Sequence, residues 1–167
     1  MKSLAAPFTH YLNASQGWLL LGDAVEAEAE LDRLGPNERA HPEVLEQRYQ
    51  IHALRGEWTR CFELAQNVLA QVPEESFGWI QSAYAVRRMP GGGVDAAFEA
   101  LLPAAKMCAR EPIVFFNLAC YACQLGKSDD AMEWLREALK LGARTKILAM
   151  AKSDSDLAAL RERLVEL

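Results

Sequence analysis

The sequence predicts an all-α fold, an array of about four helix-turn-helix units that stack into a superhelix and end in a C-terminal capping helix. Three observations support this prediction. Ala and Leu recur far more often than Val, Ile and Thr, and aromatic residues make up only 8% of the chain, which favours helices over strands. Small residues and glycines return with a period of 34 residues. Apolar residues between them follow helical spacing, so each unit can cover its apolar face only by stacking on the next.

Each unit is expected to hold two helices joined by a tight turn. The units are 8–41, 42–75, 76–111 and 112–145. A glycine ends the first helix in three of them, because it adopts a left-handed backbone without strain. These glycines are Gly22, Gly56 and Gly126. After each turn comes a small residue, which lets the second helix cross the first at a short distance. These small residues are Ala27, Cys61, Ala97 and Ala131.

Local signals agree with the expected helix starts. Asp23, with Glu26 three residues on, predicts a capping box for the second helix of the first unit. Pro42 and Pro112 fall in the first turns of the second and fourth units, where a missing N–H costs nothing. These signals place helix starts at the unit boundaries.

The third unit differs from the others in two ways. Its turn is the longer segment 90–93, Pro-Gly-Gly-Gly, which makes the unit two residues longer. Pro103 lies inside the helix expected over 94–108, so we expect a kink there, with the carbonyl of Glu99 freed.

The tail is expected to close the array. Residues 146–151 predict a short turn of helix, and residues 153–167 predict a final helix that starts at Ser153 with Asp156. Its apolar stripe consists of Leu157, Leu160 and Leu164. An open array needs such a closing element with one polar face.

The fourth unit reads Phe115-x-x-Leu118-Ala119-x-x-Ala122-x-x-x-Gly126 and then Ala131-x-x-x-Leu135-x-x-Ala138. This pattern resembles that of tetratricopeptide repeat (TPR) proteins, and together with the tail it is similar to a group of bacterial TPR-like proteins. The resemblance covers most of the chain. It implies a right-handed α-α solenoid, a single domain over 1–167 with its cap at 146–167.

The resemblance also implies where a ligand lies. In TPR arrays, positions two, five, nine, twelve and thirteen of the first helices line a concave groove. The residues carried over as a peptide-binding groove are Gln50, Phe77, Ile80, Tyr84, Arg87, Arg88, Phe116, Asn117 and Gln124. Arg87 and Arg88 could receive a carboxylate by paired hydrogen bonds. A second interpretation stays open for Phe77, Tyr84 and Phe116, whose rings could instead pack against the tail or neighbouring helices.

Charge and composition narrow the partner class. The formal net charge is −5, which argues against nucleic acid or an anionic membrane as a partner. Residues 1–75 have a net charge of −6 and residues 76–167 a net charge of +1, so the two ends differ. The sequence lacks an apolar run long enough for a membrane span and a convincing secretory signal, which predicts a cytoplasmic location.

The sequence therefore predicts a protein-interaction scaffold that binds a peptide or protein segment, as a monomer or weak homodimer, without catalytic residues or cofactor. An alternative is a small TPR-type secretion chaperone similar to class II chaperones of type III secretion. A third hypothesis is a metal or redox protein using Cys120 and Cys123, which have Cys-x-x-Cys spacing. We expect no metal site, because a structural zinc needs four ligands and the other cysteines fall in other units.

Overall fold

The structure, a computed structural model, describes residues 3–167 except the side chain of Glu166. The described residues form eleven α-helices and two 3-10 segments, joined by turns and loops, with no strand among them. The elements are α1 (Thr9–Leu20), α2 (Ala24–Leu31), α3 (Pro36–Arg39), α4 (Pro42–Leu54), α5 (Trp58–Gln71), α6 (Ser76–Arg88), α7 (Val94–Leu101), α8 (Ala104–Met107), α9 (Pro112–Gln124), α10 (Ser128–Leu141), α11 (Arg144–Ser153), η1 (Ser155–Leu160) and η2 (Arg163–Glu166).

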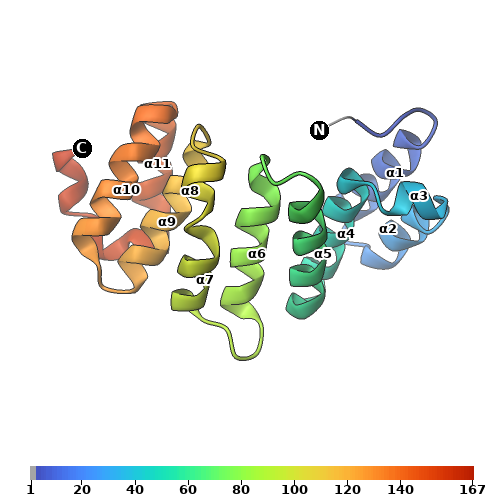
Figure 1. The fold of residues 1–167 in the computed structure, drawn as a ribbon, viewed down its shortest axis with the longest axis horizontal. Helices are drawn as coiled ribbons and strands as arrows, with labels where there is room; N and C mark the ends of the chain where they lie inside the picture. Colours follow the sequence, from blue (N-terminus) through green and yellow to red (C-terminus); the bar gives the residue numbers. More distant parts are fainter. Residues whose placement is uncertain (1–2) are drawn as a thin grey trace.

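The helices follow one another across the molecule in chain order, from the N-terminal end to the C-terminal end (Figure 1). Within the units, α1 contacts α2, α4 contacts α5, α6 contacts α7 and α9 contacts α10. Between the units, α5 packs on α6 and α7 packs on α9. This sequential pairing confirms the predicted all-α solenoid. The division into four units with the bounds given above stays a prediction, although α4, α6 and α9 begin at its unit starts.

The predicted turns and helix crossings are present. Gly22, Gly56 and Gly126 have φ angles of 78°, 71° and 74°, the left-handed backbone that favours glycine. The small residues that follow these turns are completely buried. They are Ala27, Cys61, Ala97 and Ala131. Close helix crossings therefore recur along the array, as the period of small residues predicts.

The helix starts are partly as predicted. Pro42 and Pro112 are the first residues of α4 and α9. Asp23 caps α2, and its carboxylate accepts hydrogen bonds from the backbone N–H groups of Val25 and Glu26. The return bond of a capping box is replaced, since the N–H of Asp23 donates to the carbonyl of Trp18 at 2.9 Å. The cap is confirmed and the reciprocal box is wrong.

Pro103 interrupts its helix rather than kinking it. The helix expected over 94–108 is split into α7, which ends at Leu101, and α8, which begins at Ala104. Pro103 has no N–H to continue the ladder of hydrogen bonds. The N–H groups of Ala105 and Lys106 instead donate to carbonyls three residues earlier, those of Leu102 and Pro103. The tighter turn ends one helix and starts the next.

The cap also differs from the prediction. The α-helix of the tail is α11, and Ser153 is its last residue rather than the start of a new helix. The residues expected to form the final α-helix form η1 and η2 in 3-10 geometry. A 3-10 helix has three residues per turn, so Leu157 and Leu160 lie in line on one side, and both are fully buried. Burial of these leucines thus favours the 3-10 form.

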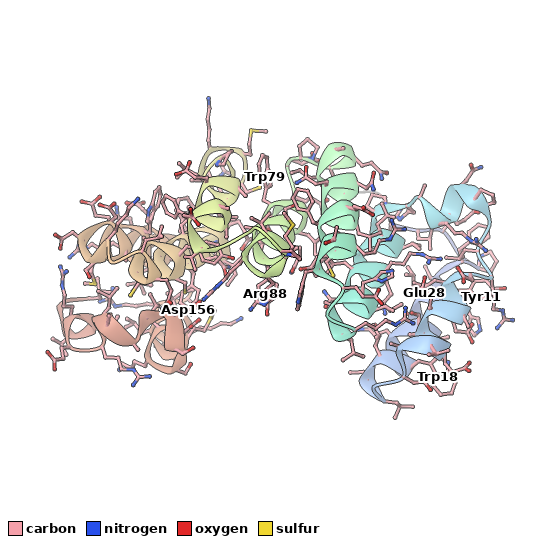
Figure 2. The ribbon with its side chains drawn as sticks, turned by 90° about the horizontal axis from the view of Figure 1, so that it is seen from below. Tyr11, Trp18, Glu28, Trp79, Arg88 and Asp156 are labelled. Carbon is pink, nitrogen blue, oxygen red and sulfur yellow. The ribbon has the colours of Figure 1, made fainter. Side chains whose placement is uncertain are left out.

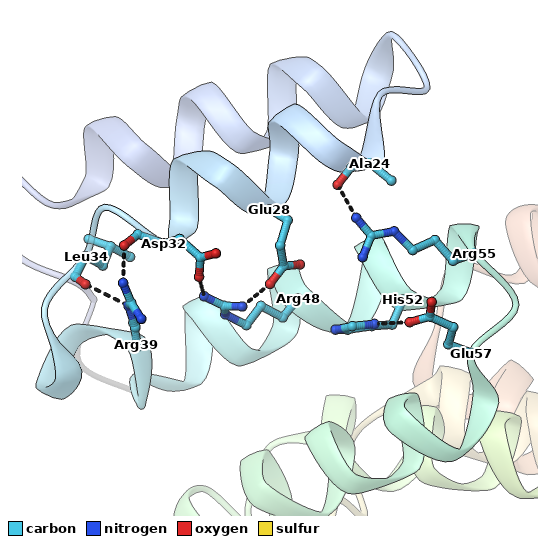
Figure 3. Close-up of polar contacts among 9 residues, drawn as sticks. All are labelled: Ala24, Glu28, Asp32, Leu34, Arg39, Arg48, His52, Arg55 and Glu57. Carbon is cyan, nitrogen blue, oxygen red and sulfur yellow. Dashed lines mark hydrogen bonds and ion pairs between the residues drawn. The ribbon is translucent and has the colours of Figure 1, made fainter.

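Polar contacts join the first two units on the surface that α2 shares with α4 (Figure 3). Arg48 of α4 bonds to the carboxylate of Glu28 and, at 2.7 Å, to that of Asp32, both on or just after α2. Arg55 donates to the carbonyl of Ala24 at 2.8 Å. The hydrogen bond from Arg48 lowers the pKa of Asp32. These contacts orient the acidic N-terminal unit relative to the rest of the array.

Candidate peptide-binding groove

The array bends like an arch, and its two ends lie on the same side of the middle helices (Figure 2). Arg88 and Asp156 lie on this inner side, which we call the concave side, whereas Trp79 lies on the opposite side. Trp79 Nε1 donates to the carbonyl of Pro73 at 2.9 Å. Arg88, the last residue of α6, therefore faces the concave side.

A cation stacked on aromatic rings occupies the middle of the concave side. The guanidinium of Arg88 lies 3.3 Å from the ring centre of Tyr84 and 5.4 Å from that of Trp58. The two rings meet edge to face at 5.8 Å. Arg88 donates one hydrogen bond, to the carbonyl of Tyr84 at 3.1 Å, and it pairs with no carboxylate in the described part of the chain. We call Trp58, Tyr84 and Arg88 the Arg88 cluster.

The neighbouring arginine is already paired. Both terminal nitrogens of Arg87 bond to the carboxylate of Asp156, one of them at 3.0 Å. This pairing raises the pKa of Arg87. The same guanidinium lies 5.7 Å from the ring centre of Tyr121. Arg87 thus binds a carboxylate, as its chemistry allows, but that carboxylate belongs to the tail of the same chain.

A polar recess of about 440 Å³ connects the two arginines with α9 and the tail. It is lined by Tyr84, Arg87, Arg88, Asn117, Cys120, Tyr121, Asp154, Ser155 and Asp156. Asn117 Nδ2 donates to the carbonyl of Ile113 at 2.8 Å, which leaves its side-chain oxygen as an acceptor. The recess therefore offers a cation, an amide oxygen and aromatic surface within one small volume, next to the carboxylates of Asp154 and Asp156.

The other residues expected in the groove are divided between surface and core. Gln50 and Gln124 are exposed, and Ile80 is partly buried against the large C-terminal core cluster. Phe77 is partly buried and meets Tyr49 edge to face at 5.6 Å. Phe116 is only 4% exposed and belongs to the same buried cluster as Leu157 and Leu160. A side chain this buried is closed to a partner, so the expectation that Phe116 lines the groove is wrong.

Sequence reasoning missed two features of the concave side. Trp58 is the first residue of a second helix, so no groove position of the repeat includes it. The one sequence feature that could have indicated its role is the position of Trp58, two residues after the turn at Gly56. The structure places the Trp58 ring beside Tyr84 and Arg88 of α6. Asp156 was noted only as part of a helix start, and the 69 residues that separate it from Arg87 leave no local pattern.

A carboxylate with an unusual pKa lies at another groove position. Burial, together with the nearby charges of Glu75 and Glu43, raises the pKa of Glu46 to about 7. Glu46 therefore gains or loses its proton near neutral pH. The charge of this part of α4 consequently depends on pH.

The Cys-x-x-Cys pair is buried. Cys120 and Cys123 are 3% and 6% exposed. Burial raises the pKa of both thiols, and the nearby carboxylates of Asp154 and Asp156 raise that of Cys120 further. Protonated thiols are poor nucleophiles and poor metal ligands. Among the side chains that the structure describes, no three of His, Cys, Asp or Glu are grouped closely enough to hold a metal ion.

Two solved structures share the architecture of this chain over nearly its whole length. One is TTC0263, a thermophilic TPR protein of Thermus thermophilus, with 18% identity and a TM-score of 0.67 over 96% of this chain and 100% of that one. The other is MamA (41-end) of Desulfovibrio magneticus RS-1, with 17% identity and a TM-score of 0.64 over 99% of this chain and 97% of that one. No family profile matches the sequence. No curated protein matches it either.

The paired helices and glycine turns define this chain as a helical-repeat array. Within that class, its fold is TPR-like, as both solved structures show. At these identities the likeness concerns the fold alone. None of the helices described for this chain has the length and apolar character needed to cross a bilayer.

Proposed function

We propose that this protein is an interaction scaffold that holds a segment of a partner protein against its concave side, with the Arg88 cluster as the main contact. The supporting observation is Arg88 itself, an exposed cation that is oriented by two aromatic rings and lacks a carboxylate partner in the described chain. Aromatic residues and arginines near the centre of an interface commonly supply most of its binding energy. The TPR-like fold supports the general role of a scaffold.

The chemistry of the cluster defines the segment that it would hold. A guanidinium has five N–H donors, and Arg88 makes one hydrogen bond to the residues that the structure describes. The remaining donors suit the two oxygens of a carboxylate. Tyr84 is 38% exposed, so it offers apolar surface beside this site. The expected ligand therefore contains Asp or Glu, or a terminal carboxylate, next to an apolar side chain.

Amide side chains would extend the site. Asn117 of α9 lines the recess beside Arg88, and Gln50 of α4 is an exposed residue at an expected groove position, so both have hydrogen-bonding groups for a partner's backbone. Phe77 and Ile80 would add apolar contact from α6. An extended or helical segment that crosses α4, α6 and α9 would reach all of these residues. We infer that the site accepts a segment rather than a single small molecule.

A peptide-display selection on the immobilised full chain tests this proposal. The selected peptides should carry an acidic residue beside an apolar one. Arg88→Glu should weaken their binding by about 10-fold to 100-fold, the range for loss of hydrogen bonds between charged groups. Arg60→Glu is the matched control, because Arg60 is an exposed arginine of α5 that pairs with Glu63 of its own helix. It should change the affinity by less than about 2-fold.

Helicity measured by circular dichroism must be the same for both variants. Equal affinity for the wild type and Arg88→Glu would contradict the proposal, as would a selection without saturable binders. The single substitution is preferable to one that also changes Arg87, because Arg87 is needed to hold Asp156.

A further inference from the structure

The tail of the chain occupies part of the concave side that a partner would otherwise use. Segment 154–164, which we call the C-terminal segment, packs against α9 through η1. Cys120 and Gln124 of α9 are groove positions, and both contact this segment. Cys120 Sγ lies 3.7 Å from a carboxylate oxygen of Asp154, and Gln124 Nε2 donates to the carbonyl of Asp156 at 3.0 Å. The segment therefore lies where a bound peptide is expected.

Its contacts combine a paired carboxylate with buried leucines. Asp156 receives two hydrogen bonds from Arg87. Leu157, directly after it, and Leu160, three residues further, are fully buried, and Leu164 is 5% exposed. At the far end, Arg163 bonds to Asp129 at 2.9 Å. An acid followed by leucines one helical turn apart is thus a pattern that this surface binds.

The segment is held mainly by these side chains. Two of its backbone hydrogen bonds are long: 3.3 Å from Leu157 to Asp154 and 3.4 Å from Arg161 to Ala158. The usual distance is about 2.9–3.0 Å. The 3-10 form also has poorer hydrogen-bond geometry than an α-helix. A short 3-10 segment of this kind is held in place mainly by its side-chain contacts, and another chain could supply equivalent ones.

We propose that the C-terminal segment is an intramolecular ligand, and that a partner protein with an acidic residue followed by Leu at the next position and Leu three positions later binds by displacing it. This inference rests on the proposed function, since it names a second partner pattern for the same concave side. A partner with this pattern would form the bond to Arg87 and fill the space of Leu157 and Leu160. The loss of the segment's own contacts would then be offset by equivalent ones, and binding would be restricted to partners that supply all of them.

Hydrogen exchange of the full chain tests whether the segment opens separately. Amides of 155–164 should exchange faster than those of α9 in the wild type. Asp156→Asn should accelerate exchange in this segment by about 10-fold or more, because it weakens a charged hydrogen-bond pair. Exchange in α9 and α10 should be unchanged. Asp32→Asn is the matched control, because it removes another arginine-bonded carboxylate, at the opposite end of the array, and should leave the segment unaffected.

A labelled peptide with the sequence of residues 153–167 tests the binding pattern. It should bind Asp156→Asn saturably, and about 10-fold or more tightly than the wild type, whose own segment competes. The same peptide with Leu157→Asp and Leu160→Asp should not bind. Arg60→Glu, at the exposed arginine of α5 that serves as the control above, should change the affinity for this peptide by less than about 2-fold.

Three results would overturn the inference. One is that the amides of the segment exchange at the same rate as those of α9, in the wild type and in Asp156→Asn. The segment would then be a permanent part of the core. Another is absence of saturable peptide binding to either protein. The third is concentration-dependent dimerisation of Asp156→Asn, measured by sedimentation, because the occupant would then be a second copy of this chain. None of them affects the Arg88 selection, so failure of the two proposals can be told apart.

Discussion

Replacement of glycine by alanine should change the stability in opposite directions at Gly17 and Gly78. The difference arises because only Gly78 lies at the contact between the second and third units. Gly17 lies inside α1, and a Cβ added there would meet no atom within 4 Å. Gly78 lies in α6, and a Cβ there would lie 2.8 Å from the N, Cα and Cβ atoms of Leu69 in α5. Backbone atoms cannot move aside as a flexible side chain can. Gly78 is therefore the residue that lets α5 and α6 approach closely.

The magnitudes follow from these distances. Ala is favoured over Gly inside a helix by about 0.5–1 kcal/mol, so Gly17→Ala should stabilise the protein by that amount. The same gain at Gly78 is offset by overpacking, which typically costs about 1–3 kcal/mol. Gly78→Ala should then lose about 1–2 kcal/mol. For a chain of this size, the Tm should rise by roughly 1–4 °C in the first variant and fall by roughly 2–8 °C in the second.

Urea and thermal unfolding followed by circular dichroism measure both variants. The sign of the difference is the decisive result, since propensity alone predicts that both variants gain stability. A Gly78→Ala protein as stable as Gly17→Ala would refute the close approach of α5 and α6. An unchanged m value would show that the unfolded surface is the same in all three proteins.

Two further predictions concern the core and the pH dependence. Ala119→Trp should destabilise the fourth unit by more than about 3 kcal/mol, because Ala119 is fully buried in α9, which packs against α10. A melting curve like that of the wild type would contradict the predicted repeat register. Glu46→Gln should stabilise the protein by about 1–2 kcal/mol at pH 8 and have little effect at pH 4. The reason is that the pKa of Glu46 is raised to about 7 in the folded state. Ionisation of Glu46 therefore lowers the stability of the wild type as the pH rises from about 4.5 to 7. Urea unfolding at both pH values measures this effect, and an equal effect at pH 4 and pH 8 would contradict the burial of its carboxyl group.

Part of the candidate site was accessible from the sequence. The repeat register placed Tyr84, Arg87 and Arg88 on one side of α6, and they lie together around one recess. The sequence left open whether Phe116 faces the groove or the tail. Phe116 is buried in the C-terminal core cluster, and that burial depends on contacts between residues far apart in the chain. Trp58 was missed for a similar reason, since it reaches Arg88 from another helix pair.

The amino-acid sequence by itself determined the all-α solenoid, its turns and most of its helix starts. These features depend on local physics that repeats along the chain: glycine at a left-handed turn, proline in a first turn, and small residues at each close crossing. Only the tertiary structure decided that Pro103 divides a helix, that the last residues adopt 3-10 geometry, and that Asp156 pairs with Arg87 while Arg88 stays without a carboxylate among the described residues. At Pro103 the sequence shows the missing N–H but not whether the helix bends or ends there. The other two outcomes depend on contacts between residues far apart in the chain, about which a local pattern holds no information.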